Sequence, residues 1–72
     1  MSKADEMFKK LGYKKEEHHY HGANTIDYEN LENGTAIDFM LEDKWVKVWH
    51  ITVTLEELQA INEKVKELGW IK

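Results

Sequence analysis

The stretch TIDYENLENGTAIDFML, residues 25–41, decides the fold because it reads as two β-strands joined by a turn. In its first half, apolar and acidic side chains alternate with a period of two, as in a half-buried strand. An Asn-Gly dipeptide at residues 33–34 then supplies the strongest short-range signal for a hairpin. The second half alternates again and places Ile37, Phe39 and Leu41 on one face. We therefore expect an antiparallel hairpin whose face with these three residues packs against the core.

Two further strands flank this hairpin. Residues 13–20 are polar and alternate only weakly, and their charges are typical of an edge strand that discourages pairing with other sheets. Residues 42–44 form a second tight turn, and residues 45–51 follow as a strand. In this last strand Val46 and Val48 share one face and two tryptophans share the other, so both faces are apolar.

Both ends of the chain carry the signals of helices that stop at glycine. Ser2 is a good N-cap for the first helix, and Gly12 ends it. Thr54 and Glu57 form a capping box for the second helix, which ends at Gly69. The apolar stripe expected to bury this second helix consists of Leu55, Leu58, Ile61, Val65 and Leu68.

These elements predict one α+β domain over residues 1–72, in the order α-β-β-β-β-α. Short connections favour pairing between strands that are neighbours in the sequence, so the sheet is expected to be a four-stranded antiparallel meander. Both helices are expected to pack on one face of it. A chain of 72 residues, with 42% hydrophobic and 33% charged content, has room for a single core.

Composition narrows the classes of function. The ten basic residues are all lysines and the net charge is −4, so nucleic-acid binding is not expected. The chain has no cysteine and no apolar run long enough to cross a bilayer, which favours a cytoplasmic protein without a membrane partner. With no glycine-rich phosphate loop and a small core, neither an enzyme nor a cofactor site is expected.

The first candidate site is one face of the predicted sheet. Lys47 lies between Trp45 and Trp49, which argues against burial of that side of the strand. If the valines point into the core, both tryptophans stand on an open face, where they are typical of interaction hot spots. The alternative is that the tryptophans form the core and the valines face outward. The protein-binding residues expected on the open face are Trp45, Trp49, Met40, Asp38, Asp27 and Glu29.

The partner of such a face is either another protein or a second copy of the chain. Residues 16–43 contain eight carboxylates and no lysine, so this region could dock on a basic partner or imitate nucleic-acid phosphate. A solvated sheet face with hydrophilic turns is the simpler reading of the same charges. Homodimerisation is the structural rival, because it would cover an apolar patch symmetrically.

The second candidate is a histidine cluster. His18, His19 and His21 lie within four residues, and His19 and His21 would share one face of an extended strand. Neutral imidazoles at this spacing can bind zinc, nickel or copper when a third ligand converges, such as a nearby carboxylate or His50. The alternative is a polar edge strand and turn that bind no metal.

The stretches ADEMFKKLGYKK, residues 4–15, and TLEELQAINEKVKELGW, residues 54–70, resemble small uncharacterised proteins of phages and prophages of low-GC Gram-positive bacteria. These motifs encode helix caps and core stripes, so no functional residue carries over from the resemblance. What it implies is a context, because small phage proteins outside the virion often bind a host or phage macromolecule. Together with the open face and the composition, this context gives the leading hypothesis, a non-enzymatic phage or prophage accessory protein that binds another protein.

Overall fold

The computed structural model of the protein describes residues 2–49 and 52–71. Four antiparallel strands form one sheet in the order β1-β2-β3-β4, and a helix lies before and after them in the chain. This architecture confirms the predicted α-β-β-β-β-α order. The elements are α1 (Lys3–Lys10), β1 (Lys14–Tyr20), β2 (Ala23–Asn30), β3 (Thr35–Met40), β4 (Trp45–Val48) and α2 (Leu55–Glu67).

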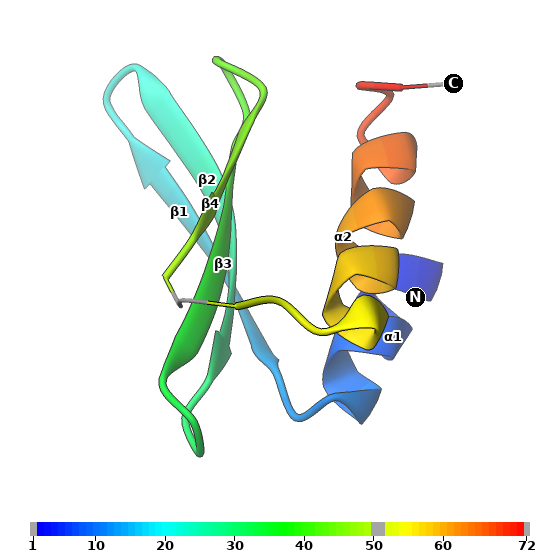
Figure 1. Cartoon of the computed structure of the whole chain (residues 1–72). Coiled ribbons are helices and arrows are strands. Elements are labelled where there is room, and N and C mark those ends of the chain that lie inside the picture. The colour runs from blue at the N-terminus through cyan, green and yellow to red at the C-terminus, as the bar shows by residue number, and fades with distance from the viewer. Residues whose placement is uncertain (1, 50–51, 72) are drawn as a thin grey trace.

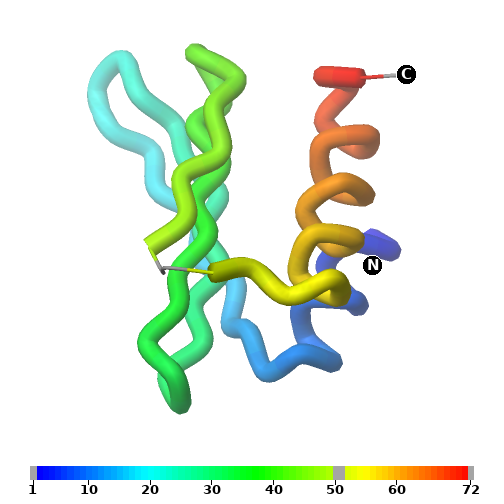
Figure 2. Tube along the Cα trace, viewed as in Figure 1, coloured from blue at the N-terminus to red at the C-terminus, as the bar shows by residue number. Residues whose placement is uncertain are grey.

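Both helices lie on the same side of the sheet and leave its other side uncovered (Figures 1 and 2). The core between the two layers is aromatic. Phe8 of α1 stacks on Tyr28 of β2, with ring centroids 4.0 Å apart, and meets Tyr13 and Phe39 edge-on at 5.5 and 6.3 Å. Ile37 is also fully buried in this core. Large apolar side chains that bury completely provide most of the free energy that holds such a small domain together.

The helix ends form as their sequences predict. The Ser2 side chain accepts a hydrogen bond of 2.9 Å from the backbone of Asp5, and Gly12 takes a φ of 91° after α1. Tyr13 then donates its backbone N–H to the carbonyl of Phe8 at 3.0 Å. This is the glycine-terminated ending in which the chain folds back on its helix. It places the Tyr13 ring in the core.

The hairpin between β2 and β3 is confirmed, but its loop is longer than a two-residue turn. Asn30 pairs with Thr35, so residues 31–34 form the loop. Gly34 ends it with a φ of 74°, and its N–H donates to the carbonyl of Asn30 at 2.9 Å. Glycine favours this position because the left-handed conformation does not strain it.

The register of β4 resolves which face of the last strand is buried. Val46 pairs with Phe39 and Val48 pairs with Ile37, so both valines face the helices. Trp45 pairs with Met40 and therefore stands on the uncovered side. The alternative with the tryptophans in the core is wrong. The predicted strand extended to residue 51, but residues 50 and 51 lie outside the described part of the chain.

The apolar stripe predicted for α2 is only partly right. Ile61, Val65 and Leu68 pack against the core, whereas Leu55 and Leu58 are 65% and 56% exposed. The helix is rotated toward α1 relative to the prediction. Its most buried residues are Glu57, Ala60 and Lys64.

Polar pairing accounts for this rotation. The Tyr13 hydroxyl donates a hydrogen bond to the Glu57 carboxylate, and the Lys64 ammonium lies 3.4 Å from an Asp5 carboxylate oxygen. Because their polar ends are satisfied, both long side chains can bury their methylene stems. Burial follows these pairs more closely than it follows hydrophobicity along the helix.

Leu58→Ala tests the observed rotation of α2. We expect it to lower the free energy of unfolding by less than about 1 kcal/mol, because its side chain is largely exposed. Ile37→Ala, which empties a fully buried position, is the comparison and should cost about 2–5 kcal/mol. Urea unfolding followed by circular dichroism measures both. Equal losses for the two variants would mean that the predicted stripe, and not the observed rotation, describes the helix.

Candidate interaction surface on the open sheet face

We call the side of the sheet turned away from the helices the open face (Figure 1). Alternate residues of all four strands point to it. The strand register places Asp27 beside Asp38, and Thr25 beside Met40. All six binding residues named from the sequence lie on this face, and their role in binding stays a prediction. The open face consists of Lys14, Glu16, His18, Tyr20, Ala23, Thr25, Asp27, Glu29, Ala36, Asp38, Met40, Trp45, Lys47 and Trp49.

The two tryptophans are exposed, and one of them is held in place. Trp45 is 66% exposed and Trp49 is 52% exposed. The Trp49 indole N–H donates to Asp38 Oδ2 at 2.6 Å, and the Lys47 ammonium lies 3.9 Å from the Trp49 ring centroid. Contacts of this kind fix a side chain before a partner arrives, which lowers the entropy lost on binding.

Two aspartates occupy the middle of the open face. Asp27 and Asp38 lie directly opposite each other on the two central strands. The Asp27 side chain is only 15% exposed, and its Oδ1 accepts no hydrogen bond from an N–H or hydroxyl group among the described residues. Burial raises the pKa of Asp27, and the negative charge of Asp38 and a hydrogen bond between the two carboxyl groups raise it further. His18, whose Nε2 lies 3.1 Å from Asp27 Oδ2, opposes this shift when it is charged.

No lysine neutralises this pair within residues 2–49 and 52–71. Lys47 pairs with Asp38 in the strand register, but its ammonium lies over the ring of Trp49 instead. The lysine ammonium groups that form ion pairs in the described ranges are those of Lys15 and Lys64, on the helix side of the molecule. The centre of the open face therefore carries negative charge without a lysine counter-charge.

The histidines do not form the arrangement expected for a metal site. β1 ends at Tyr20, so His21 lies in the turn and does not share a strand face with His19. His19 Nδ1 is 3.0 Å from the side-chain oxygen of Asn24. Among the described residues no three histidine or carboxylate ligands are grouped to hold a metal ion. His50 lies outside them, and the metal hypothesis stays a prediction that needs such a further ligand.

Sequence reasoning missed His18 as a member of the site. Its Nε2 lies 3.1 Å from Asp27 and 3.4 Å from Glu16, and its ring stacks on Tyr20 with centroids 5.6 Å apart. The weak alternation of β1 could not show which histidine faces outward. The pairing of His18 with Thr25 in the sheet register decides it.

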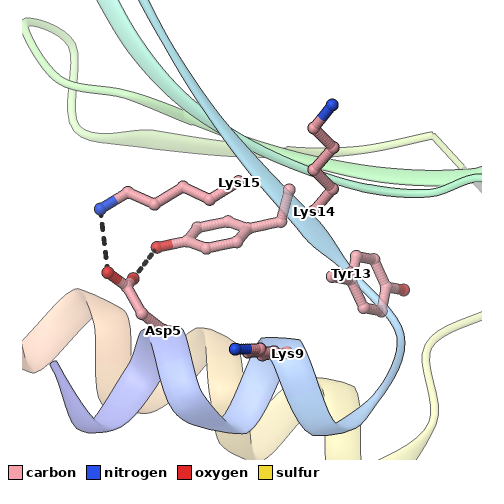
Figure 3. Close-up of a pocket in the computed structure, with 6 residues that line it drawn as sticks. Asp5, Lys9, Tyr13, Lys14 and Lys15 are labelled. Atoms are coloured by element: carbon pink, nitrogen blue, oxygen red, sulfur yellow. Dashed lines mark hydrogen bonds and ion pairs between the residues drawn. The ribbon is translucent and has the colours of Figure 1, made fainter. Parts of the chain in front are cut away.

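A second feature, on the helix side, is a cavity of about 370 Å³ between α1 and β1 (Figure 3). Asp5 accepts hydrogen bonds from the Tyr28 hydroxyl and, at 2.9 Å, from Lys15, while the Lys14 side chain points away from the helix (Figure 3). Asp5, Tyr28 and Lys15 pair with one another at this cavity, so we interpret these three residues as a structural junction between α1 and the sheet. Its lining residues are Asp5, Lys9, Tyr13, Lys14, Lys15 and Tyr28.

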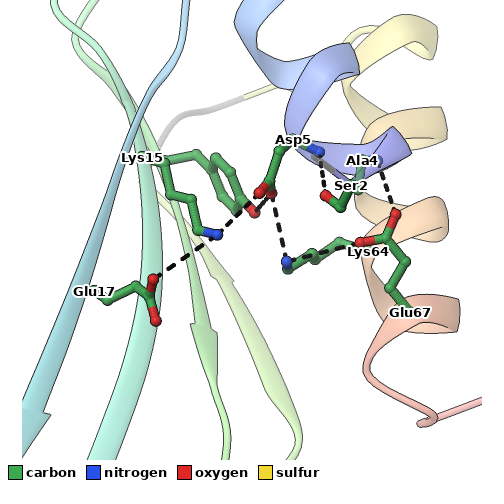
Figure 4. Close-up of polar contacts among 8 residues, drawn as sticks. Ser2, Ala4, Asp5, Lys15, Glu17, Lys64 and Glu67 are labelled. Atoms are coloured by element: carbon green, nitrogen blue, oxygen red, sulfur yellow. Dashed lines mark hydrogen bonds and ion pairs between the residues drawn. The ribbon is translucent and has the colours of Figure 1, made fainter.

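The Asp5 carboxylate also links the two helices (Figure 4). Lys64 reaches Asp5 from α2, and Glu67 accepts the backbone N–H of Ala4 at 2.9 Å. Burial alone would raise the pKa of Asp5, but the hydrogen bonds from Tyr28 and Lys15 and the positive charges of Lys64 and Lys15 lower it to about 2. Asp5 is therefore charged and fully paired at neutral pH.

The fold and the open face define a small α+β domain with an uncovered, aromatic and acidic sheet face. Comparisons of the chain with protein-family models, with curated proteins and with solved structures found no match. No helix within the described ranges is both long and apolar enough to cross a membrane.

Proposed function

We propose that the chain is a non-enzymatic interaction protein that binds another protein through the open face. The observation that supports this most is the exposure of Trp45 and Trp49 on the side of the sheet that the helices leave uncovered. Tryptophan is enriched among residues that dominate binding energy, because it buries a large rigid area at little entropic cost. The proposal includes a role as a phage or prophage accessory protein in the host cytoplasm. Only the sequence resemblance supports this part of it.

The surroundings of the tryptophans support the same proposal. Met40 lies beside Trp45 and adds an adaptable apolar surface. The aspartates sit on the two central strands, which hold their positions more firmly than loops would. Exposed aromatic rings beside an acidic centre provide both contact area and a means to select partners.

Selection from a displayed library of protein fragments tests the proposal, with the full chain as bait. Fragments selected on the wild type should bind Trp45→Ala at least about 30-fold more weakly, the loss expected for a hot-spot tryptophan. Leu31→Ala is the matched control, because Leu31 is 79% exposed but lies in the β2–β3 loop, outside the open face. Its affinity should equal that of the wild type. Equal binding by Trp45→Ala would remove the proposal.

Sedimentation velocity over a range of concentrations tests the rival, a homodimer through the same face. The proposal expects a monomer at micromolar concentration. A dimer that Trp45→Ala dissociates and Leu31→Ala does not would replace the heterologous partner by a second copy of the chain.

A further inference from the structure

We infer that the open face takes a partner segment that carries an arginine, whose guanidinium binds across Asp27 and Asp38. This inference rests on the proposed function and adds the chemistry of the partner. It stands on the charge of the face, on the geometry of its two central carboxylates and on the exposed rings beside them.

The first argument is charge complementarity. Like charges that lie directly opposite on neighbouring strands destabilise a sheet, and Asp27 and Asp38 are such a pair. The other charged or titratable neighbours of the pair are Glu16 and His18 on β1, Glu29 on β2 and Lys47 on β4. Of these, His18 is the one that forms an ion-pair contact with Asp27. The Lys47 ammonium lies over the Trp49 ring instead. A cation from a partner would supply the missing counter-charge.

The second argument is the arrangement of the carboxylate oxygens. Asp38 Oδ2 accepts the Trp49 indole N–H, and Asp27 Oδ2 lies next to His18. Asp27 Oδ1, by contrast, accepts no hydrogen bond from an N–H or hydroxyl group of the described residues, and the group that shares a hydrogen bond with the Asp27 carboxyl across the strands is Asp38. A guanidinium carries five N–H donors in a flat fork and can bridge two carboxylates, whereas an ammonium is a compact and strongly hydrated point charge.

The third argument is the ring surface beside the acids. Trp45 in β4 and Trp49 just after it lie on either side of Lys47, and the Lys47 ammonium already packs on the Trp49 ring. Trp45 is 66% exposed, so its ring is accessible to a second cation. A planar guanidinium can stack on an aromatic ring while it donates to carboxylates, which favours arginine over lysine.

Protonation of Asp27 should be coupled to binding of the partner's cation. Burial and the charge of Asp38 raise the pKa of Asp27, and a bound cation would lower it again. Binding therefore favours the charged carboxylate, and affinity for the cation should fall as the pH is lowered through the titration of the pair.

N-acetyl-L-argininamide is the probe, titrated into the full-length protein and followed by NMR at the Trp45 and Trp49 indole N–H groups and the aspartate carboxyl carbons. We expect saturable shifts with a dissociation constant on the order of millimolar, as for a single anchoring contact. N-acetyl-L-citrullinamide has nearly the same shape without the charge and should bind at least about fivefold more weakly. N-acetyl-L-lysinamide separates a guanidinium from an ammonium and should also bind more weakly.

Asp27→Asn and Glu29→Gln are matched variants, because each removes one charge from the open face of β2. The first should lose most of the binding of the arginine probe, and the second should keep it. Asp38→Asn provides a second variant at the pair. Shifts that never saturate, equal binding of the citrulline or lysine probe, or equal losses in Asp27→Asn and Glu29→Gln would overturn the inference.

The two proposals fail in different ways. If selected fragments depend on Trp45 but carry no arginine, the open face binds proteins and the inference about arginine is wrong. If selected fragments do not depend on Trp45, the proposed function is wrong, whatever the probe titration shows at the aspartates.

Discussion

Phe8→Ala is expected to lower the free energy of unfolding by about 3–5 kcal/mol, the range for removing a buried aromatic ring. Phe8 is fully buried and contacts the rings of Tyr13, Tyr28 and Phe39. It is the side chain through which α1 meets both the sheet and the turn that follows the helix. Its loss leaves a cavity at the centre of the only core that the described residues form.

A domain of this size has little stability to spare, since native proteins are stable by only about 5–15 kcal/mol. Urea unfolding followed by circular dichroism should therefore show the Phe8→Ala midpoint moving far toward zero denaturant. Phe8→Leu is the control, because it refills most of the volume and should recover much of the loss. A change smaller than about 1.5 kcal/mol for Phe8→Ala would show that the two layers do not depend on this ring.

Asp5→Asn is expected to lower the free energy of unfolding by about 2 kcal/mol at pH 7, the value that corresponds to the lowered pKa of this carboxyl. The substitution removes the charge that pairs with Lys15 and with the largely buried Lys64. Glu6→Gln is the matched control, because it removes a charge from the same first turn of α1 at an exposed position. It should cost less than about 0.5 kcal/mol.

The acid dependence of this effect follows from the sign of the shift. The pKa of Asp5 is about 2 in the folded protein, below its ordinary value of 3.8. Its contribution to stability is therefore complete above about pH 4 and is lost as the pH falls toward 2. The difference between wild type and Asp5→Asn should shrink over this range in urea titrations at several pH values. A difference that stays constant down to pH 2 would mean that packing, and not charge, makes Asp5 important.

The local elements of this protein could be predicted from residues that are close together in the sequence. Gly12 ends α1 because it takes a positive φ, and the capping box of Thr54 and Glu57 starts α2. Alternation placed Ile37 and Phe39 on the buried side of β3, where both are fully buried. These features depend on steric preferences and hydrogen bonds within a few residues, so the surrounding fold does not need to be known.

Contacts between distant residues decided the rest. The sequence by itself determined the order of the elements, their caps and the alternation of the hairpin. Only the tertiary structure decided that α2 buries Lys64 and exposes Leu58, because Lys64 pairs with Asp5, 59 residues away. Only the sheet register decided that His18 joins Asp27 on the open face. Hydrophobicity along the chain cannot show such pairings, because a polar side chain is buried where its partner lies, and the fold alone brings that partner close.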